Sequence, residues 1–516
     1  MFSNRSNIVV LIWAWATVTG LSQPSPFVTQ TSGNLELNGH PFYFVGGNAY
    51  YLMEEAARGD TTLVKNLFAT ARQLGMTVIR TWGFFDSGDT LNPAVIQWRP
   101  GGFNEAALRA LDYVIWQAKQ SGLRLVIPLV NNWDDYGGMN QDVRWRMAQG
   151  DHNRSASEVR FTESDQQRTV LGLGGRLYRV AMSDMFGHDD FYTDVTIRNW
   201  YKSYVSVILG RVNTLTGVVY RNEPTILAWE LANEPRSSDR SGVIVSGWAD
   251  DVSLFLKQLD TNHLVGTGEE GFDNSVTGYS IPAYNNQLWL VDGTAGVSFT
   301  MNLALRHIDL AGIHMYPQSW GLNNNGGNIW IRDHVRMAAT AGKPLVLGEF
   351  GVLVDQPATY DSWLTTVLLD GGGGALVWQL SEGARGNNDG YGIRCPGSGS
   401  VCTVLQDQAR MFTEKSAGSP LSAPPEFLLF QNYPNPFNGQ TTIAYALPSD
   451  ANVTLSLYNS VGELVRVLVD GFQHAGTRKE LLSVEWLSSG VYFYQANVQL
   501  SEGRGSSGTK KLVIVK

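Results

Sequence analysis

The sequence predicts an α/β fold, a (β/α)8 TIM barrel, followed by a small all-β domain built as an immunoglobulin-like sandwich. Two observations carry this prediction. Over residues 27–413, eight short apolar runs alternate with helical patterns, as in a parallel barrel surrounded by helices. Over residues 427–516, most runs alternate apolar and polar residues, with Gly and Ser turns between several of them, which is typical of an antiparallel sandwich.

The eight apolar runs are the expected barrel strands. Most are rich in Val, Ile and Leu, as parallel strands buried on both faces should be. They cover residues 42–46, 77–81, 125–130, 226–231, 264–267, 310–314, 345–347 and 375–379.

Two of the intervening segments show clear helical periodicity. Residues 61–74 and 105–120 carry apolar residues at i, i+3, i+4 and i+7, and each is followed by a glycine, Gly75 or Gly122, a common helix stop. A doubly wound parallel sheet is the alternative fold. No GxGxxG or GxxxxGK[ST] sequence follows any of the strands, so the barrel is favoured.

The expected domain borders follow from composition. Residues 1–22 are predicted to be a signal peptide: Arg5 precedes an apolar run at 8–21, which is shorter than the ~20 residues that span a bilayer. A buried N-terminal helix is the alternative. Residues 27–413 form the expected barrel and 414–426, rich in Ser, Ala and Pro, a linker. The tail strands are expected at 441–447, 452–458, 464–470, 481–486, 490–500 and 509–516.

The chain is acidic and poor in charge, with a net charge of −9 and 16% charged residues, against ~25% in an average soluble chain. Binding to nucleic acid requires a basic face and is not expected. The 16 Trp, 20 Tyr and 21 Phe fit a neutral ligand bound by flat apolar faces. A core rich in Trp accounts for the same composition.

The two cysteines, Cys395 and Cys402, flank a flexible loop. In an exported chain they are expected to form a disulfide, with two free thiols as the alternative. No CxxC or HExxH sequence occurs, so no metal and no cofactor are expected. The acidic stretch at 187–194 lacks the spacing of an EF-hand calcium loop, and a solvated loop is favoured there. The polar stretch at 150–170 has no assigned place.

Function in a barrel of this kind lies where the strands end. The fourth strand is followed by Asn233 and Glu234, and the seventh by Glu349. Two carboxyl groups across one barrel mouth can cleave a glycosidic bond, because one protonates the leaving oxygen while the other attacks or stabilises the anomeric carbon. A second Asn-Glu-Pro at 222–224 precedes its strand and is expected at the opposite end.

Other strand ends are also polar or aromatic. Arg80 follows two apolar residues of the second strand, so a buried cation is expected, and Glu349 is the natural carboxylate partner. The remaining residues of this kind are Trp82 after the second strand, Asn132 and Trp133 after the third, His314 and Tyr316 at the sixth, and Trp378 at the eighth.

These residues resemble a known family. Asn-Glu-Pro after strand four and Gly-Glu-Phe after strand seven resemble the clan A glycoside hydrolases. Arg80, Asn233, Glu234, His314, Tyr316, Glu349 and Trp378 match the pattern of family 5 within that clan. Longer blocks resemble its β-1,4-mannanases: GGNAYYL (46–52), VIRTWGF (78–84), LVNNWDDYGGM (129–139), the run at 191–236 and GTGEEGF (266–272).

The resemblance implies a role for each matching residue. Glu234 is implied as the general acid and then the base, and Glu349 as the nucleophile of a retaining reaction. Glu234 is therefore expected to have a raised pKa. The other implied roles are Asn233 on the 2-hydroxyl of the sugar, Arg80 and Tyr316 holding Glu349, His314 orienting the pair, Trp378 as sugar platform and Arg236 beside the leaving sugar, with Trp82, Trp133, Tyr51 and Trp320 as weaker candidates.

The tail resembles the C-terminal sorting domains of the type IX secretion system. YPNPFN (433–438) and the basic terminal strand (509–516) carry this resemblance. An immunoglobulin-like spacer or a carbohydrate-binding module is the alternative. Together, the sequence predicts a secreted or cell-surface endo-β-1,4-mannanase. Its expected partners are β-mannan and the secretion machinery, and no transmembrane segment is expected in the mature protein. The alternatives are another family 5 β-glycanase, an exo-β-mannosidase or a non-catalytic polysaccharide-binding barrel.

Overall fold

The computed structural model describes residues 26–150, 187–386, 389–418, 427–432, 435–500 and 505–516. The expected signal peptide at 1–22 lies outside the described residues. So does the polar stretch at 150–170, apart from Gly150 at the end of a helix.

All eight predicted barrel strands are confirmed. They form one parallel sheet in the order β10-β9-β8-β5-β4-β13-β12-β11. A single parallel bridge from Gly266 to Leu310 joins its two edges and nearly closes the barrel. The strands are β4 (Phe44–Asn48), β5 (Val78–Arg80), β8 (Arg124–Pro128), β9 (Ile226–Glu230), β10 (Leu264–Gly266), β11 (Ala311–Met315), β12 (Leu345–Phe350) and β13 (Gly374–Val377).

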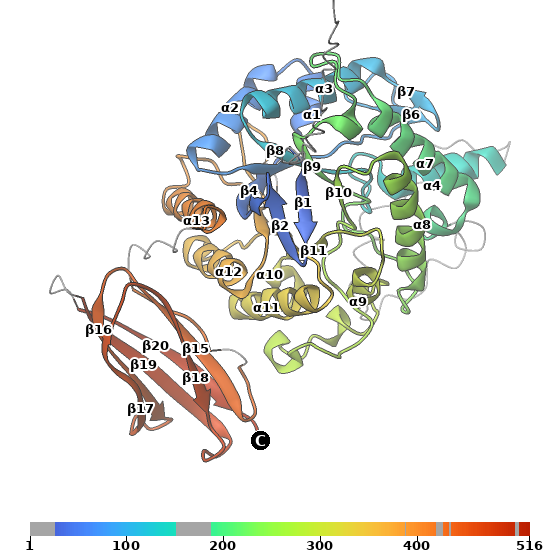
Figure 1. Ribbon diagram of the computed structural model, residues 1–516. Coiled ribbons are helices and arrows are strands. Elements are labelled where there is room, and N and C mark those ends of the chain that lie inside the picture. Colours follow the sequence, from blue (N-terminus) through green and yellow to red (C-terminus); the bar gives the residue numbers. More distant parts are fainter. Residues whose placement is uncertain (1–25, 151–186, 387–388, 419–426, 433–434, 501–504) are drawn as a thin grey trace, which may run out of the picture.

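Helices surround this sheet (Figure 1). Both predicted helices are confirmed: α2 begins after Asp60, whose carboxylate accepts from the Leu63 amide, and α3 begins after Asn104, which accepts from the Ala106 amide. Such caps satisfy amides that have no partner within the helix. The α-helices are α1 (Leu52–Ala57), α2 (Thr61–Gln73), α3 (Glu105–Gln120), α4 (Gly138–Gly150), α6 (Asp190–Thr193), α7 (Val195–Gly210), α8 (Val243–Leu259), α9 (Phe299–Leu303), α10 (Pro317–Trp320), α11 (Asn324–Thr340), α12 (Gln356–Asp370) and α13 (Ser400–Ser416).

A small three-stranded sheet covers the amino-terminal end of the barrel. It consists of β1 (Val28–Thr31), β2 (Asn34–Leu37) and β3 (His40–Pro41). Val28 and Leu35 of this sheet are buried in one cluster with the first residues of several barrel strands, such as Val78 and Leu264. One end of the barrel is therefore plugged with apolar side chains, and the polar side chains gather at the other end.

The expected disulfide between Cys395 and Cys402 is present. It joins the segment after β13 to the first turn of α13. This helix ends at Ser416, inside the segment 414–426 that was expected to be a linker. Residues 419–426 of that segment lie outside the described residues.

The tail is all-β, with two sheets around one apolar core. One sheet holds β14 (Leu428–Leu429), β15 (Gln440–Leu447) and β18 (Gly476–Ser483). The other holds β17 (Leu464–Gln473), β16 (Ala451–Asn459), β19 (Gly490–Leu500) and β20 (Gly505–Ile514). The strand expected at 481–486 begins earlier, because β15 pairs with β18 from Leu447 opposite Gly476 to Gln440 opposite Ser483.

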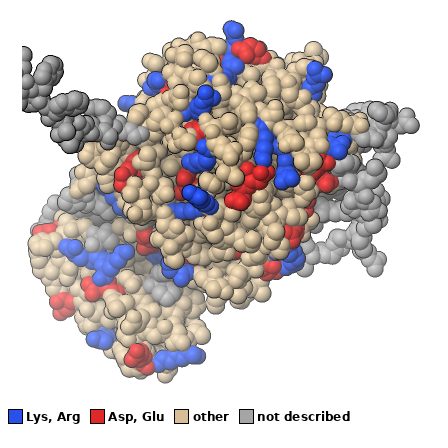
Figure 2. All heavy atoms as spheres, turned by 45° about the vertical axis from the view of Figure 1, so that its right-hand side comes forward, with Lys and Arg blue, Asp and Glu red and all other residues tan. Residues whose placement is uncertain are grey.

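The surface carries few charges. On the face shown in Figure 2, acidic and basic side chains are scattered among uncharged ones, with no continuous basic area. In the described part of the chain, no helix is both long and apolar enough to cross a membrane.

We predict that Asp112→Ala lowers the free energy of unfolding by about 3 to 5 kcal/mol, the cost of breaking a buried ion pair. The fully buried Asp112 carboxylate of α3 accepts from Arg211, Thr214 and Tyr220. Glu105→Ala is the matched control, because Glu105 pairs with the same arginine but is 56% exposed, and it should cost less than about 1 kcal/mol. Equal losses in urea denaturation would contradict this prediction.

Candidate active site

Arg80, the last residue of β5, is the centre of the polar cluster at the open end of the barrel. Its side chain is fully buried. Nε donates to Glu230 Oε2 at 2.7 Å, Nη1 to Glu349 Oε1 at 2.6 Å and to Asn48 Oδ1 at 3.2 Å, and Nη2 to Asn233 Oδ1 at 2.7 Å. The predicted pairing of Arg80 with Glu349 is therefore present.

Glu230 and Asn48 were missed by the sequence analysis. Both are the last residues of barrel strands, β9 and β4. The signal was available for Glu230, because a carboxylate directly follows a buried apolar run there and requires a cation.

Glu349 is held at both oxygens. Oε1 accepts from Arg80, and Oε2 accepts from the Tyr316 hydroxyl at 2.6 Å. Burial raises the pKa of Glu349 above its ordinary value, while the positive charges of His314 and Arg80 act in the opposite direction. Its carboxylate is thus fixed in position and ready to act as a base or nucleophile when ionised.

Glu234 is held by a different set of donors. Trp133 Nε1 donates to Oε2 at 2.6 Å, and His314 Nδ1 lies 2.7 Å from Oε1. The backbone of Glu234 adopts a left-handed conformation, with φ of 53°, which is rare for a residue with a side chain and is common at functional sites.

The expected rise in the pKa of Glu234 is wrong for this arrangement. Burial by itself raises the pKa, but the hydrogen bond and charge of His314, together with Arg236 and Trp133, outweigh it and lower the pKa to about 2. Burial also lowers the pKa of His314, yet the charge of Glu349 and the bond to Glu234 raise it above its ordinary value. The lowered pKa of Glu234 and the raised pKa of His314 favour an ionised glutamate beside a protonated histidine across this 2.7 Å contact.

The two carboxyl groups are close together. Within the described residues, Glu234, His314 and Glu349 are the one group of potential metal ligands, with ligand atoms within 4.8 Å of one another. Their carboxylate oxygens already accept from Arg80, Tyr316, Trp133 and His314, which describes an acid–base cluster. One oxygen of each carboxyl group therefore lies within 4.8 Å of the other, closer than the ~6.5–9.5 Å between the carboxyl groups of inverting glycosidases.

Asn233 and Asn132 connect the third and fourth strand ends. Asn233 accepts from Arg80 and donates through Nδ2 to Asn131 Oδ1 at 3.0 Å. Asn132 Oδ1 accepts from the backbone amide of Arg236 at 3.2 Å. Both amides therefore hold the loop that carries Glu234.

Arg236 lies beside Glu234 and pairs with a residue that the sequence analysis did not single out, Glu270. Both contacts of this bidentate pair measure 2.6 Å. The guanidinium also lies 5.2 Å from the Trp133 ring and 4.9 Å from the Phe272 ring. Burial raises the pKa of Glu270 to about 7. Two consecutive glutamates after the fifth strand were the available signal.

Trp378 lies half-buried at the mouth, with its ring stacked on Tyr50 at 5.6 Å and 9°. Trp82 also packs against Tyr50, with ring centroids 4.9 Å apart, and is only 5% exposed. Tyr51 does not line the site, because it is fully buried and donates to the Leu380 carbonyl. Trp320 is 5% exposed and packs against Phe272 and Trp330.

The second Asn-Glu-Pro lies at the plugged end of the barrel, as predicted. Its Glu223 precedes β9, is fully buried, and accepts from Lys119 Nζ at 3.0 Å and from the Thr225 hydroxyl at 2.7 Å. Its role is structural, and it resembles Glu234 in sequence context only.

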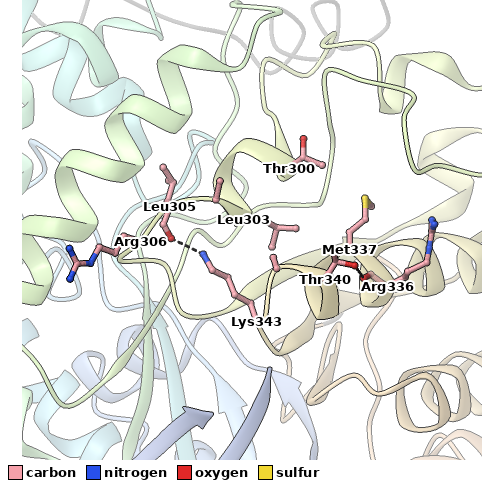
Figure 3. Close-up of a pocket in the computed structure, with 10 residues that line it drawn as sticks. Thr300, Leu303, Leu305, Arg306, Arg336, Met337, Thr340 and Lys343 are labelled. Atoms are coloured by element: carbon pink, nitrogen blue, oxygen red, sulfur yellow. Dashed lines mark hydrogen bonds between the residues drawn. The ribbon is translucent and has the colours of Figure 1, made fainter. Parts of the chain in front are cut away.

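Two other candidate features lie apart from the cluster. In the acidic stretch at 187–194, Asp189 accepts from the Ser238 amide and Asp194 from the first amides of α7. A hollow of about 650 Å³ lies between α9 and α11 (Figure 3); its Lys343 donates to the Leu305 carbonyl, and Arg306 and Arg336 extend to opposite sides.

A family model described as GH family 5 beta-mannosidase-like matches residues 25–377. The chain belongs to this family of glycoside hydrolases. It is 34% identical over 411 residues, covering 74% of this chain and 90% of the relative, to a putative mannan endo-1,4-beta-mannosidase P of Arabidopsis thaliana. Mannan endo-1,4-beta-mannosidase 5 of Solanum lycopersicum is 33% identical, with 75% of this chain and 89% of the relative covered.

A solved structure also supports membership in this family. The endo-beta-1,4-mannanase from Thermotoga petrophila matches with a TM-score of 0.65 and 28% identity, covering 93% of this chain and 99% of the other. Residues 431–515 match a secretion system C-terminal sorting domain. This tail indicates that the family 5 glycosidase is secreted or exported to the cell surface.

We predict that the stabilising effect of His314 depends on pH in a narrow window. Its raised pKa contributes stability that is present below the ordinary value of 6.5 and lost as pH rises through the folded value. The lowered pKa of Glu234 contributes stability that is present above 4.5 and lost as pH falls. The difference in unfolding free energy between wild type and His314→Gln should therefore be largest between pH 4.5 and 6.5.

Urea denaturation at a series of pH values measures this difference. His474→Gln, at a tail histidine that is 76% exposed, controls for the loss of an exposed histidine. A wild type minus His314→Gln difference that is constant from pH 4 to 9 would show that the histidine does not share a proton with Glu234.

Proposed function

We propose that this chain is a secreted endo-β-1,4-mannanase that hydrolyses internal bonds of mannan, glucomannan or galactomannan with retention of configuration. The observation that carries the proposal is the pair of buried carboxyl groups, Glu234 and Glu349, with oxygens within 4.8 Å at the barrel mouth. They lie in a chain that resembles enzymes named as mannanases over about three quarters of its length.

In the first step, Glu234 gives its proton to the glycosidic oxygen while a Glu349 oxygen attacks the anomeric carbon. The bond from that carbon to the leaving sugar breaks, and an ester between the remaining sugar and Glu349 forms. In the second step, the Glu234 carboxylate takes a proton from water, the water oxygen attacks the same carbon, and the ester bond breaks. Both carboxyl groups return to their starting states.

The proton for the first step comes from the pair of Glu234 and His314. Transfer from Nδ1 to Oε1 across 2.7 Å produces the neutral acid without any proton from solvent. A bound sugar favours this transfer, because it displaces water and a neutral carboxyl group costs less to bury than a carboxylate.

The other residues position the sugar. We assign Trp378 as the platform under the sugar at the cleavage point, Asn233 as a partner of its 2-hydroxyl, and Arg236 as a contact of the leaving sugar. Arg80 and Tyr316 hold Glu349. Trp133 both holds Glu234 and lines the barrel mouth. Trp82 supports the sugar-binding residues by packing against Tyr50, and Asn132 supports them by accepting from the Arg236 amide.

A cellulase-type family 5 enzyme and an exo-β-mannosidase remain the competing functions. A non-catalytic polysaccharide-binding barrel is disfavoured because both carboxyl groups are retained, each with its own hydrogen-bond donors. Release of reducing sugar from mannan, glucomannan and carboxymethylcellulose, compared under one set of conditions, separates mannanase from cellulase. Products of several sugar units indicate endo action, whereas mannose alone indicates exo action.

We predict that Glu234→Gln and Glu349→Gln each lower kcat on mannan by about a thousandfold or more, because the first removes the acid and base of both steps and the second removes the nucleophile. Glu223→Gln, at the structural Asn-Glu-Pro, is the matched control and should keep its activity once folded. NMR of the first product should show the retained anomer. Inverted product, or a Glu349→Gln variant with most of its activity, would disprove the mechanism.

We further propose the domain borders 1–22 for the signal peptide, 27–413 for the barrel, 414–426 for the linker and 427–516 for an immunoglobulin-like sorting domain recognised by the secretion machinery.

Removal of residues 427–516 should leave kcat/KM unchanged, since every residue of the proposed site lies in the barrel, but should abolish export from a host with a type IX system. Activity assays on the purified protein and on the culture medium measure the two effects. Normal export of the truncated chain would contradict the assignment of the tail.

A further inference from the structure

We infer that Asp389 is a positioning residue, which fixes the indole ring of Trp378 as a platform for sugar. This inference rests on the proposed function, because the platform role of Trp378 belongs to it. Asp389 lies in the segment between β13 and α13, outside the blocks that resemble mannanases.

The carboxylate of Asp389 links three groups. Oδ2 accepts from Trp378 Nε1 at 2.7 Å and from Gln379 Nε2 at 3.0 Å, and Oδ1 accepts from the backbone amide of Tyr391 at 3.0 Å. The ring and the segment beside it are thereby held by one side chain. A carboxylate acceptor makes the bond to the indole N–H stronger than a neutral acceptor would.

The segment that carries Asp389 is itself anchored. The Ile393 amide donates to the Gln379 carbonyl, and the Ser381 amide donates to the Ile393 carbonyl, both at 2.8 Å. Two residues further on, Cys395 is joined to Cys402 in α13. Asp389 therefore lies in a loop whose two ends are held together by the backbone bonds of Gln379 and Ser381 to Ile393. The disulfide also ties the loop to α13.

The same segment reaches the second catalytic carboxyl group. The ring of Tyr391 contacts that of Tyr316 edge to face at 5.5 Å, and the Tyr316 hydroxyl donates to Glu349. Asp389 thus connects the sugar platform to the support of the proposed nucleophile.

A hydrogen bond to the indole edge matters because stacking holds a face of the ring but does not fix the position of its edge. Tyr50 stacks on that face at 5.6 Å, and the χ2 angle of a tryptophan has a broad energy well. A ring that is already fixed loses less conformational entropy when sugar binds. Electron density drawn from the carboxylate through the N–H also makes the ring a better partner for sugar C–H groups.

The test is a double-mutant cycle with Trp378→Phe, which keeps an aromatic ring but has no N–H donor. On β-1,4-mannohexaose, Asp389→Ala should lower kcat/KM about tenfold, mainly through KM, in the wild-type background. It should have less than a twofold effect in the Trp378→Phe background. Asp389→Asn, which keeps one acceptor oxygen, should restore most of the loss. Asp407→Asn, at a residue of α13 whose side chain is 37% exposed and pairs with Arg410, is the control and should leave kcat/KM unchanged.

A second measurement does not depend on activity. In ¹⁵N-labelled protein, the indole N–H resonance that is missing in Trp378→Phe belongs to Trp378, and it should move upfield in Asp389→Ala as the hydrogen bond is lost. An unmoved resonance, or the same loss of kcat/KM in both backgrounds, overturns the inference. Absence of mannan hydrolysis by the wild-type protein overturns the proposed function instead, and the indole resonance then remains the test of Asp389.

Discussion

The structure of the barrel mouth depends on one buried cation. Arg80 has no contact with solvent, and a guanidinium in that position is stable only if every donor has an acceptor and the charge is matched. Four acceptors from three strands surround it: Glu230 and Asn233 at the end of β9, Glu349 in β12 and Asn48 at the end of β4. Lysine could not bind them all, because its single ammonium lacks the planar array of donors that reaches four acceptors at once.

The arrangement around Arg80 explains why two glutamates in one cavity have different chemistry. Glu349 is bound to a permanent cation and a phenol, so its charge is compensated from within the barrel. Glu234 is bound to Trp133 and to His314, whose charge can move. His314 Nδ1 lies 2.7 Å from Glu234 but 3.5 Å from Glu349, so proton transfer inside the site favours Glu234, as its proposed role as acid and base requires.

Sequence was sufficient for features with a local signal. Each barrel strand has its own apolar run, and the buried position of Arg80 after Val78 and Ile79 was enough to predict its pairing with Glu349. The sequence was insufficient where the environment of a residue is made by side chains from other strands. The sign of the Glu234 pKa shift was wrong because Trp133 and His314 supply donors that outweigh burial. Tyr51 was misplaced because no periodicity marks which side of the turn after β4 faces the core. Glu230 was missed although its place after a buried apolar run was a local signal, and Asp389 was missed because the loop that carries it has no periodic pattern that would place its side chain beside Trp378.

The negative charge of each carboxyl group raises the pKa of the other, and this electrostatic coupling suits the proposed two-step reaction. The charge of Glu234 raises the pKa of Glu349, and such electrostatic coupling acts equally on both groups. When the proposed ester forms, Glu349 loses its negative charge, and Glu234 becomes easier to ionise. This is the state that the second step needs, because Glu234 must then accept a proton from water. Before cleavage, the negative charge of Glu349 favours the protonated form of Glu234, which the first step needs. In the proposed ester that charge is gone, so Glu234 is freer to be the carboxylate that the second step needs.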